Sequence, residues 1–418
     1  HERFGHHGNP INLYIPMIQN VMILSHPDDI ADIARFDNQG KMNKGFVIHF
    51  IKKYLLGNGF AALDTTDQYK ALKKVMHPFF TQKNIAVFND SMKRLSIRYI
   101  EKLTDIENST EYNWQKEMTF FSMSIITHCM LGYEISAEEA ARYSTMLTEV
   151  AGYVNQKQMS SPFVLPGFVP TAANRQYKKN YKTLVELVER IIKNDEEKEA
   201  RGEGEGTLIR AIRSANLQKE VLYDQVINIF FGGHETTSHT LTMCFYRMLN
   251  HPEIFQKLQE EILANRELSP ITDKREYPYL YAFLEEVLRL DSPINIYGRD
   301  AAEKLTLKRG ITIPKGTLVI MSQYSTHRMD EFWDLPEVFN PNRFLDKNWR
   351  KHPRQHFPFG VGARSCIGRF FMYNEVATFI SEFIKKGARL TLAEGYEPER
   401  KIICTSKLHN GLPVTVHP

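Results

Sequence analysis

The stretch Phe359-Gly-Val-Gly-Ala-Arg-Ser-Cys366-Ile-Gly368, near the C-terminal end, decides the fold of this chain. It places one cysteine on a glycine-rich loop, and glycine allows positive φ and lets another group approach the backbone closely. Apolar residues at near-helical spacing predict a helix directly after the loop, ending at Lys385-Lys386-Gly387. Cys366 therefore stands at a helix N-terminus, where free N–H groups favour a thiolate. Such a thiolate suits a metal that needs one strong anionic ligand.

A lone cysteine in a turn would be interpreted as an ordinary buried cysteine. Here the neighbours favour a ligand, because Arg364 adds a cation and Phe359 adds an aromatic side chain. The pattern Phe-x-x-Gly-x-Arg-x-Cys-x-Gly resembles the haem-thiolate loop of the cytochrome P-450 family. That resemblance implies that haem b is the cofactor and that Cys366 is the axial ligand of its iron, a ligand that favours O–O cleavage.

A second signature is Gly232-Gly-His-Glu-Thr-Thr237, inside a long helix predicted over residues 222–250. Glycine within a helix costs about 1 kcal/mol relative to alanine, so the pair interrupts the helix and indicates that another group approaches the backbone. Threonine can also bond to the carbonyl of the preceding turn and open a kink. The stretch resembles the family's (Ala/Gly)-Gly-x-(Asp/Glu)-Thr-(Thr/Ser), which implies that Thr236 hydrogen-bonds the bound oxygen and that Glu235 feeds a proton relay.

Basic residues are predicted to hold the haem propionates. On a helix expected over residues 65–82, Tyr69 and Lys73 stand where the family has Trp-x-x-x-Arg, although lysine lacks the bidentate fork of arginine. Taken alone, this basic face is also what a solvated helix face looks like. By the same resemblance Arg299 and Arg364 reach the propionates, and Phe359 covers the cofactor.

Glu286 and Arg289 lie at i, i+3 on a helix predicted from Pro278 to about Leu290, where they can pair. Glu-x-x-Arg, and Phe-x-Pro-x-Arg-Phe at residues 339–344, both resemble family hallmarks. The resemblance implies a buried Glu286–Arg289–Arg343 network with a structural role.

The remaining chain predicts a mainly α fold with a minor β region, the cytochrome P-450 fold, in a single domain spanning residues 1–418. Residues 11–24 are predicted to form two strands around a Gln19-Asn20 turn, and a helix capped by Ser25 is predicted to follow. Residues 304–320 are predicted to form small strands, and Ile402…Val416 is predicted to form a hairpin. The Pro- and Gly-rich loop over residues 156–172 is apolar enough to touch a membrane or cover a channel, with burial an equal alternative.

Composition sets limits on the function. The chain has 418 residues, 42% hydrophobic and 24% charged, as in soluble globular proteins, and a net charge of +4, too small to indicate nucleic-acid binding. The four cysteines are widely spaced without CxxC, which fits a reducing compartment. No apolar run is long enough to span a membrane. Since the chain begins at His1, we expect an N-terminal segment to be missing, and whether that segment carries an anchor stays open. We therefore expect a location in the cytoplasm or on the cytoplasmic side of a membrane.

The resemblance implies an O2-dependent monooxygenase that oxidises a C–H or C=C bond of an apolar lipid, sterol or terpenoid-like molecule. No flavin or iron–sulfur motif is present, so electrons from NAD(P)H must come through a ferredoxin, flavodoxin or flavoprotein reductase. A basic face suits such an acidic partner, although a solvated face explains it equally well; its residues are Lys70, Lys73, Lys74, Arg354 and Arg369.

Two alternative functions are compatible with the same scaffold or the same cofactor. A peroxygenase or isomerase is less favoured, because such enzymes often lack the Glu235-Thr236 pair; a haem-based sensor or carrier is less favoured, because no output domain is visible. Residues expected to line the substrate pocket, or else to be plain core, are Phe46, Phe50, Ile229, Phe230, Gly233, Ile294, Ile296 and Leu408.

Overall fold

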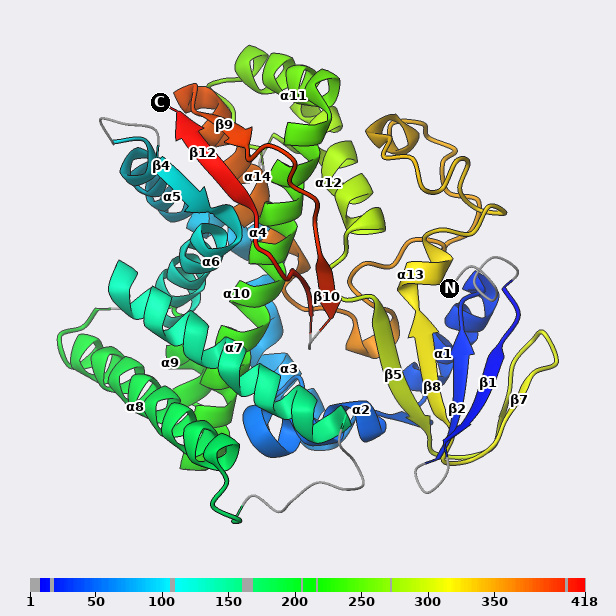
Figure 1. Cartoon of the computed structure of the whole chain (residues 1–418). Coiled ribbons are helices and arrows are strands. Elements are labelled where there is room, and N and C mark those ends of the chain that lie inside the picture. Colours follow the sequence, from blue (N-terminus) through cyan, green and yellow to red (C-terminus); the bar gives the residue numbers. More distant parts are fainter. Residues whose placement is uncertain are drawn as a thin grey trace.

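The computed structural model describes residues 8–15, 19–105, 110–159, 168–203, 206–215, 217–270, 273–402 and 405–417. Most of its α-helices form one side of the molecule, and a twisted sheet with α1 and α13 beside it forms the other. The long helix α10 runs through the helical side (Figure 1). The α-helices are α1 Pro27–Asn38, α2 Gly45–Ile51, α3 Asp67–Met76, α4 Gln82–Ile85, α5 Asn89–Thr104, α6 Trp114–Leu131, α7 Ala137–Met159, α8 Ala172–Ala200, α9 Leu208–Arg213, α10 Lys219–Asn250, α11 Pro252–Ala264, α12 Pro278–Leu290, α13 Gln323–Thr326 and α14 Arg369–Lys386.

The strands form one larger sheet and three small ones. The larger sheet has the order β1-β2-β8-β5-β3, in which β2 and β8 are parallel and the other pairs are antiparallel. The smaller sheets have the orders β4-β12-β9, β10-β11 and β6-β7. The strands are β1 Ile11–Ile15, β2 Gln19–Leu24, β3 Met42–Asn43, β4 Thr110–Asn113, β5 Ile296–Ala301, β6 Leu305–Thr306, β7 Thr312–Ile313, β8 Leu318–Ser322, β9 Arg389–Leu392, β10 Arg400–Ile402, β11 Ser406–Leu408 and β12 Pro413–His417. The mainly α fold with a minor β region is as the sequence predicts.

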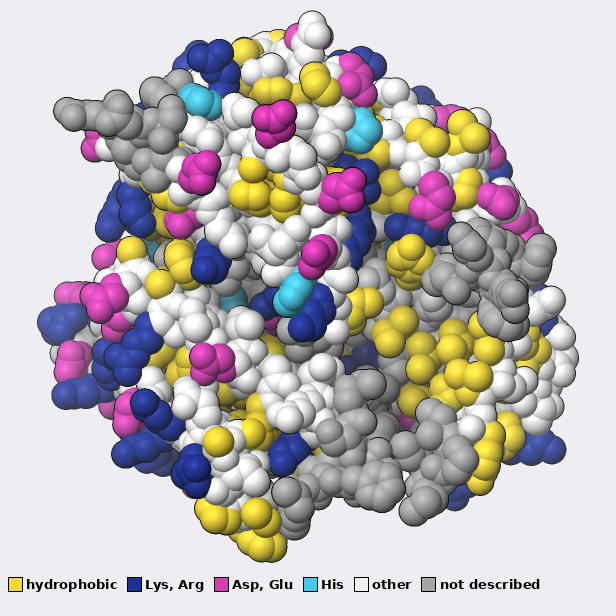
Figure 2. Space-filling view, in the orientation of Figure 1, with side chains coloured by type: hydrophobic (Ala, Val, Ile, Leu, Met, Phe, Trp, Pro, Cys, Tyr) yellow, Lys and Arg dark blue, Asp and Glu magenta, His cyan; other side chains and the backbone are white. Residues whose placement is uncertain are grey.

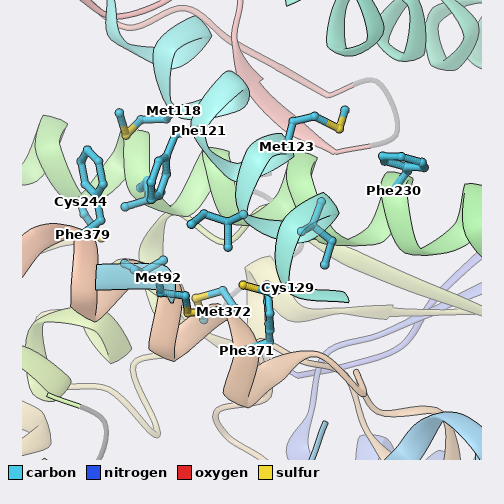
Figure 3. Close-up of a cluster of buried hydrophobic side chains, with 14 of the residues drawn as sticks. Met92, Met118, Phe121, Met123, Cys129, Phe230, Cys244, Phe371, Met372 and Phe379 are labelled. Atoms are coloured by element: carbon cyan, nitrogen blue, oxygen red, sulfur yellow. The ribbon is translucent and has the colours of Figure 1, made fainter. Parts of the chain in front are cut away.

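The helices α5, α6, α10 and α14 enclose the main core. Met92 from α5, Phe121 from α6, Cys244 from α10 and Phe379 from α14 meet in it (Figure 3). Burial of large apolar side chains on all four elements contributes most of the favourable free energy of folding. Because α10 and α14 share this core, their positions relative to each other are fixed.

A second core lies under the larger sheet and reaches the cysteine loop. Ile30 and Ile33 of α1 pack there with Val319 of β8 and with Phe357 and Val361. A Cβ on Gly362, whose φ is 71°, would stand 3.0 Å from the carbonyl oxygen of Ala34 in α1. The loop is therefore seated directly against α1, and glycine is required for that contact.

The expected break at the glycine pair is wrong, because α10 continues unbroken from Lys219 to Asn250. The two glycines differ in their surroundings. A Cβ on Gly233 would stand 2.5 Å from Cγ1 of Ile126 in α6, whereas a Cβ on Gly232 would meet no atom within 4 Å. Gly233 allows close helix packing, and Gly232 borders open space.

The first hairpin forms, but Gln19 and Asn20 belong to β2, where they pair with Ile15 and Tyr14, so the turn does not lie at these residues. Residues 16–18, between the two strands in the sequence, lie outside the described residues. The cap of α1 is His26 rather than Ser25, since the His26 side chain accepts a hydrogen bond from the Asp28 N–H.

The expected hairpin over Ile402…Val416 is also wrong. β11 pairs with β10, whereas β12 pairs with β4 and β9. The pairing of β12 with β4 at residues 110–113 is a long-range contact, and no local turn residues in the sequence predict it. Of the loop expected over residues 156–172, residues 160–167 lie outside the described residues, and residues 156–159 belong to α7 instead, which ends at Met159.

Candidate active site

A cavity of about 320 Å³ lies between α10 and the cysteine loop. On the α10 side it is lined by Gly232, Gly233, Thr236, Thr237 and Thr240. On the loop side the lining residues are Pro358, Phe359, Arg364, Ser365, Cys366, Ile367 and Gly368. The two signatures of the sequence, more than 120 residues apart, therefore face each other across one space.

The loop is folded so that it presents the sulfur of Cys366. The Cys366 N–H donates to the Phe359 carbonyl at 2.8 Å, and the Gly360 N–H donates to the Phe357 carbonyl at 2.9 Å. Gly360 and Gly362 both have positive φ, which side chains with a Cβ rarely adopt. Cys366 is exposed toward the cavity, and α14 begins three residues later at Arg369.

Cys366 differs from the other described cysteines. Cys129 and Cys244 are buried in the core, where burial raises the pKa of both thiols. Burial also raises the pKa of the Cys366 thiol, while the Gly368 N–H and the Arg369 charge act in the opposite direction. A coordinated metal ion would act in the same direction as the Gly368 N–H and the Arg369 charge and favour the thiolate. Cys404 lies outside the described residues.

One end of the cavity is lined by cations. Lys44, Arg299 and Arg364 all border it. Arg299 is held by Asp37, with Nε–Oδ1 at 3.4 Å, and by the Gly298 carbonyl at 2.8 Å. Nη2 of Arg364 donates to the Leu63 carbonyl at 2.6 Å, and its plane stacks 3.6 Å from the centroid of Tyr69. Among the described residues Nη1 of Arg364 is buried without a hydrogen-bond partner.

Tyr69 and Lys73 both bind the loop itself. The Tyr69 hydroxyl and the Lys73 ammonium each donate to the Ala363 carbonyl at 2.9 Å. Tyr69 also lines the cavity, whereas Lys73 is not among its lining residues. Lys44, which does line the cavity, was not singled out from the sequence, because an isolated lysine in a mixed segment carries no signal.

The acid and the alcohol on α10 point in different directions. The Thr236 hydroxyl donates to the Gly232 carbonyl at 3.0 Å, which is the back-bonding that the sequence suggests, and borders the cavity. Glu235 is only 5% exposed and does not line the cavity. Its Oε1 is 2.6 Å from the ammonium of Lys407 on β11, and its Oε2 has no hydrogen-bond partner among the described residues.

The expected apolar wall is only partly present. Ile229, Gly233 and Ile294 line the cavity. Phe50, Phe230 and Leu408 lie in the main core instead, and Ile296 is 49% exposed on β5. The side chain of Phe46 lies outside what the structure describes. The sequence did not single out several apolar residues that line the cavity: Phe60, Met76, Phe80, Ile126, Leu288, Pro293, Tyr297, Phe371 and Met372.

Behind the cavity, Glu286, Arg289 and Arg343 form a buried ion-pair network. Nε of Arg289 is 2.7 Å from Oε2 of Glu286, and Nε of Arg343 is 3.1 Å from Oε1. Arg289 also donates to the His327 carbonyl at 2.8 Å. These contacts connect α12 to the 327–343 segment, and none of these residues reaches the cavity.

The donor set fits a flat, iron-containing group that carries two carboxylates. The sulfur of Cys366 offers one anionic ligand, the walls are largely apolar, and the cationic end includes an unpartnered Arg364 nitrogen among the described residues. Haem b has all three complementary features: an iron ion, an apolar ring and two propionates. The residues of the cavity therefore fit haem b.

Comparison with known proteins leads to the same class of cofactor as the residues of the cavity. The sequence model of the family "Cytochrome P450" matches residues 2–389, so this chain belongs to the cytochrome P450 family. Cytochrome P450 4d2 of Drosophila melanogaster is 27% identical, over 87% of this chain and 78% of the relative. Cytochrome P450 4F6 of Rattus norvegicus is 23% identical (97% and 80% covered), and leukotriene-B4 omega-hydroxylase 3 of Mus musculus is 22% identical (96% and 81%).

Membership of the family makes the chain an oxidoreductase of the monooxygenase type. Its cofactor is haem b with a cysteine thiolate ligand, its oxidant is O2, and its electrons come from NAD(P)H through a redox partner. Within the described part of the chain, we find no helix whose length and hydropathy would let it cross a membrane.

Proposed function

We propose that this enzyme hydroxylates a long-chain lipid, sterol or terpenoid-like substrate. The reaction balances as R–H + O2 + 2e⁻ + 2H⁺ → R–OH + H2O. The observation that carries the proposal is that the sulfur of Cys366 and the hydroxyl of Thr236 border the same largely apolar cavity from opposite sides. A lipid is favoured because the walls are apolar and because one relative is a leukotriene-B4 omega-hydroxylase.

In this proposal Cys366 binds the haem iron, and the haem, when bound, activates O2. Two contacts of the loop hold the sulfur in place. The Cys366 N–H donates to the Phe359 carbonyl, and Gly362 packs closely against α1. Arg299 and Arg364 bind the propionates from the cationic end. Phe359 lines the cavity beside the sulfur, and Tyr69 holds the loop while bordering the same space.

Thr236 and Glu235 deliver the two protons. The Thr236 hydroxyl faces the cavity, where it can donate a proton once it is free of its bond to Gly232. Glu235 supplies protons from the side of Lys407, whose side chain is 20% exposed and therefore reaches solvent. Apolar walls exclude bulk water, so that proton access is limited to these side chains.

The electron donor docks on the face around the cysteine loop. Lys70 and Lys74 on α3 and Arg369 at the start of α14 are exposed there, and Lys73 and Arg354 are partly exposed. Lys70 makes an exposed ion pair with Asp67 at 3.0 Å, which a partner carboxylate can replace at little cost. We propose an acidic ferredoxin, flavodoxin or flavoprotein reductase as the partner.

We further propose that the single domain acts at the cytoplasmic side of a membrane. Leu13 and Tyr14 on β1 and Ile296 on β5 are 47%, 74% and 49% exposed. Hydrophobic side chains gather over this sheet region on the right of Figure 2. An apolar surface of this kind is suited to contact a lipid surface.

Turnover with NADPH, O2 and a surrogate reductase tests the function. Long-chain fatty acids are the first substrates to try, and we expect one hydroxylated product per NADPH when ¹⁸O2 supplies the inserted atom. Incorporation of ¹⁸O from labelled water instead, or product formation without O2, would contradict the proposal. Cys366→Ser is the matched inactive control.

A further inference from the structure

A tyrosine on α14 packs against the cysteine loop and is hydrogen-bonded to a carboxylate. The ring centroid of Tyr373 lies 5.5 Å from the ring centroid of Phe359. Phe359 lines the cavity together with Cys366, and its carbonyl accepts the hydrogen bond of the Cys366 N–H. Tyr373 does not line the cavity itself, so one aromatic ring lies between it and the space that the cofactor fills.

The hydroxyl of Tyr373 has a proton acceptor in place. It donates to Oε1 of Glu285 on α12 at 2.7 Å, which is within the distance at which a positioned base can take a proton. Burial raises the pKa of the Glu285 carboxyl, so its carboxylate is a stronger base than an exposed one. The Glu285 side chain is also 29% exposed, and a proton that it receives can therefore pass to solvent.

A second tyrosine extends the ring contact to the surface. The ring centroid of Tyr281 on α12 lies 5.9 Å from that of Tyr373. The ammonium of Lys274, an exposed residue, lies 4.1 Å from the centroid of the Tyr281 ring. The rings of Phe359, Tyr373 and Tyr281 therefore form a continuous path from the cavity wall to the surface beside Lys274.

Other tyrosines lack one half of this arrangement. A phenol that loses an electron becomes strongly acidic, so its oxidation is favoured where a base can take the proton. Tyr69 and Tyr297 line the cavity, but their hydroxyls donate to backbone carbonyls, which are poor bases. The Tyr99 hydroxyl does have a carboxylate, Oε2 of Glu117 at 2.8 Å, but its ring packs against α6 in the main core. Tyr373 combines the base with a ring contact to the cavity wall.

We propose that Tyr373 is a redox-active tyrosine that lets the enzyme reduce hydroperoxides with electrons from small phenols. This inference rests on the haem-thiolate site and adds a second activity to hydroxylation. When a hydroperoxide reacts at the cofactor without substrate, its O–O bond breaks, an electron leaves Tyr373 past Phe359, and the phenolic proton moves to Glu285. A small phenol, AH, restores Tyr373 after each electron. Two such transfers balance as ROOH + 2 AH → ROH + H2O + 2 A•.

Freeze-quench EPR spectroscopy of the holoenzyme, mixed with hydrogen peroxide in the absence of substrate, tests the inference. We expect a tyrosyl radical in the parent and loss of most of its signal in Tyr373→Phe, which keeps the ring and removes the hydroxyl. Tyr99→Phe is the matched control and should keep the signal, although Tyr99 also has a carboxylate partner. A parent without a tyrosyl radical, or a parent-like signal in Tyr373→Phe, would overturn the inference.

Glu285→Gln is an independent variant, which also serves if Tyr373→Phe does not retain haem. Its amide oxygen still accepts a hydrogen bond but is a much weaker base than a carboxylate, so the radical signal should fall. A second readout is the peroxide-dependent oxidation of guaiacol, a small phenol. It should be slower in both variants than in Tyr99→Phe, and excess peroxide should bleach their haem faster because an electron donor is missing. Equal rates in all of these proteins would contradict the role of Tyr373.

The reduced CO-bound spectrum separates this inference from the proposed function. A parent enzyme without a thiolate signature removes the haem-thiolate site and with it both proposals. A parent with the signature, combined with a radical signal that Tyr373→Phe leaves unchanged, removes only the role of Tyr373.

Discussion

The contact between Lys407 and Glu235 is the residue-scale feature that most directly links the C-terminal strands to α10. The two charged atoms are 2.6 Å apart, and Glu235 is almost fully buried. Breaking a buried ion pair by removing one partner leaves the other charge without compensation. Because Lys407 is also bonded to Thr148 Oγ1 at 3.2 Å, β11 is attached to both α7 and α10.

We predict that Lys407→Met lowers the free energy of unfolding by roughly 2 kcal/mol, because the Glu235 carboxylate is left buried and unpaired. Urea unfolding of the haem-bound protein measures the change. Lys401→Met, on an exposed position of neighbouring β10, is the control and should have little effect. In the double variant Lys407→Met/Glu235→Gln most of the loss should be recovered, and a purely additive double variant would contradict the pairing.

At the scale of elements, the packing of α10 on α6 depends on Gly233. A methyl group there would meet the side chain of Ile126 at 2.5 Å, whereas one on Gly232 would meet nothing within 4 Å. Gly233→Ala should therefore cost about 1–3 kcal/mol of stability through overpacking, despite the better helix propensity of alanine.

Gly232→Ala is the matched comparison, because it has the same propensity gain without the clash and should keep or slightly raise stability. Thermal unfolding of both variants measures the difference. Ile126→Val should relieve part of the cost in Gly233→Ala, and equal stabilities for the two alanine variants would contradict this account of the packing.

On α14, Glu375 is a fully buried carboxyl whose two oxygens lack hydrogen-bond partners among the described residues. Burial raises its pKa from 4.5 to about 8. The folded protein therefore keeps a proton that the unfolded chain loses above pH 4.5, so the free energy of unfolding should fall as pH rises toward 8 and level off above it.

Glu375→Gln should remove this contribution to the pH dependence, because the amide does not ionise. We expect the variant to be more stable than the parent at pH 8 and close to it below pH 4.5, where both states of the parent carry the proton. Chemical unfolding across this pH range is the measurement. Parallel stability curves for the two proteins would show that Glu375 is ionised in the folded state.

At the scale of the whole molecule, the parts that sequence predicts well are those with a local signal. The helix over Pro278–Leu290 and the strands near residues 304–320 agree because their periodicity and caps are local. The β12–β4 pairing was missed because its partners are about 300 residues apart in the chain. Lys44 was missed for a similar reason, since only the fold brings it to the cavity.

In the candidate active site, too, the residues that sequence predicts correctly are those that belong to a local sequence pattern. Cys366, Thr236 and Arg364 stand in fixed patterns, and the fold places all of them around one cavity. The roles predicted for them remain predictions that spectra and turnover will test. The apolar wall has no such pattern, because a phenylalanine such as Phe230 can equally face the core, as it does here.

The central claim is that Cys366 is the thiolate ligand of a haem iron, and the reduced CO-bound absorption spectrum tests it most directly. The account predicts a strongly red-shifted Soret band in the parent protein and its loss in Cys366→Ser. Cys129→Ser, at a buried core cysteine, should keep the band. A Soret band of the kind given by histidine-ligated haem, unchanged by Cys366→Ser, would contradict the account.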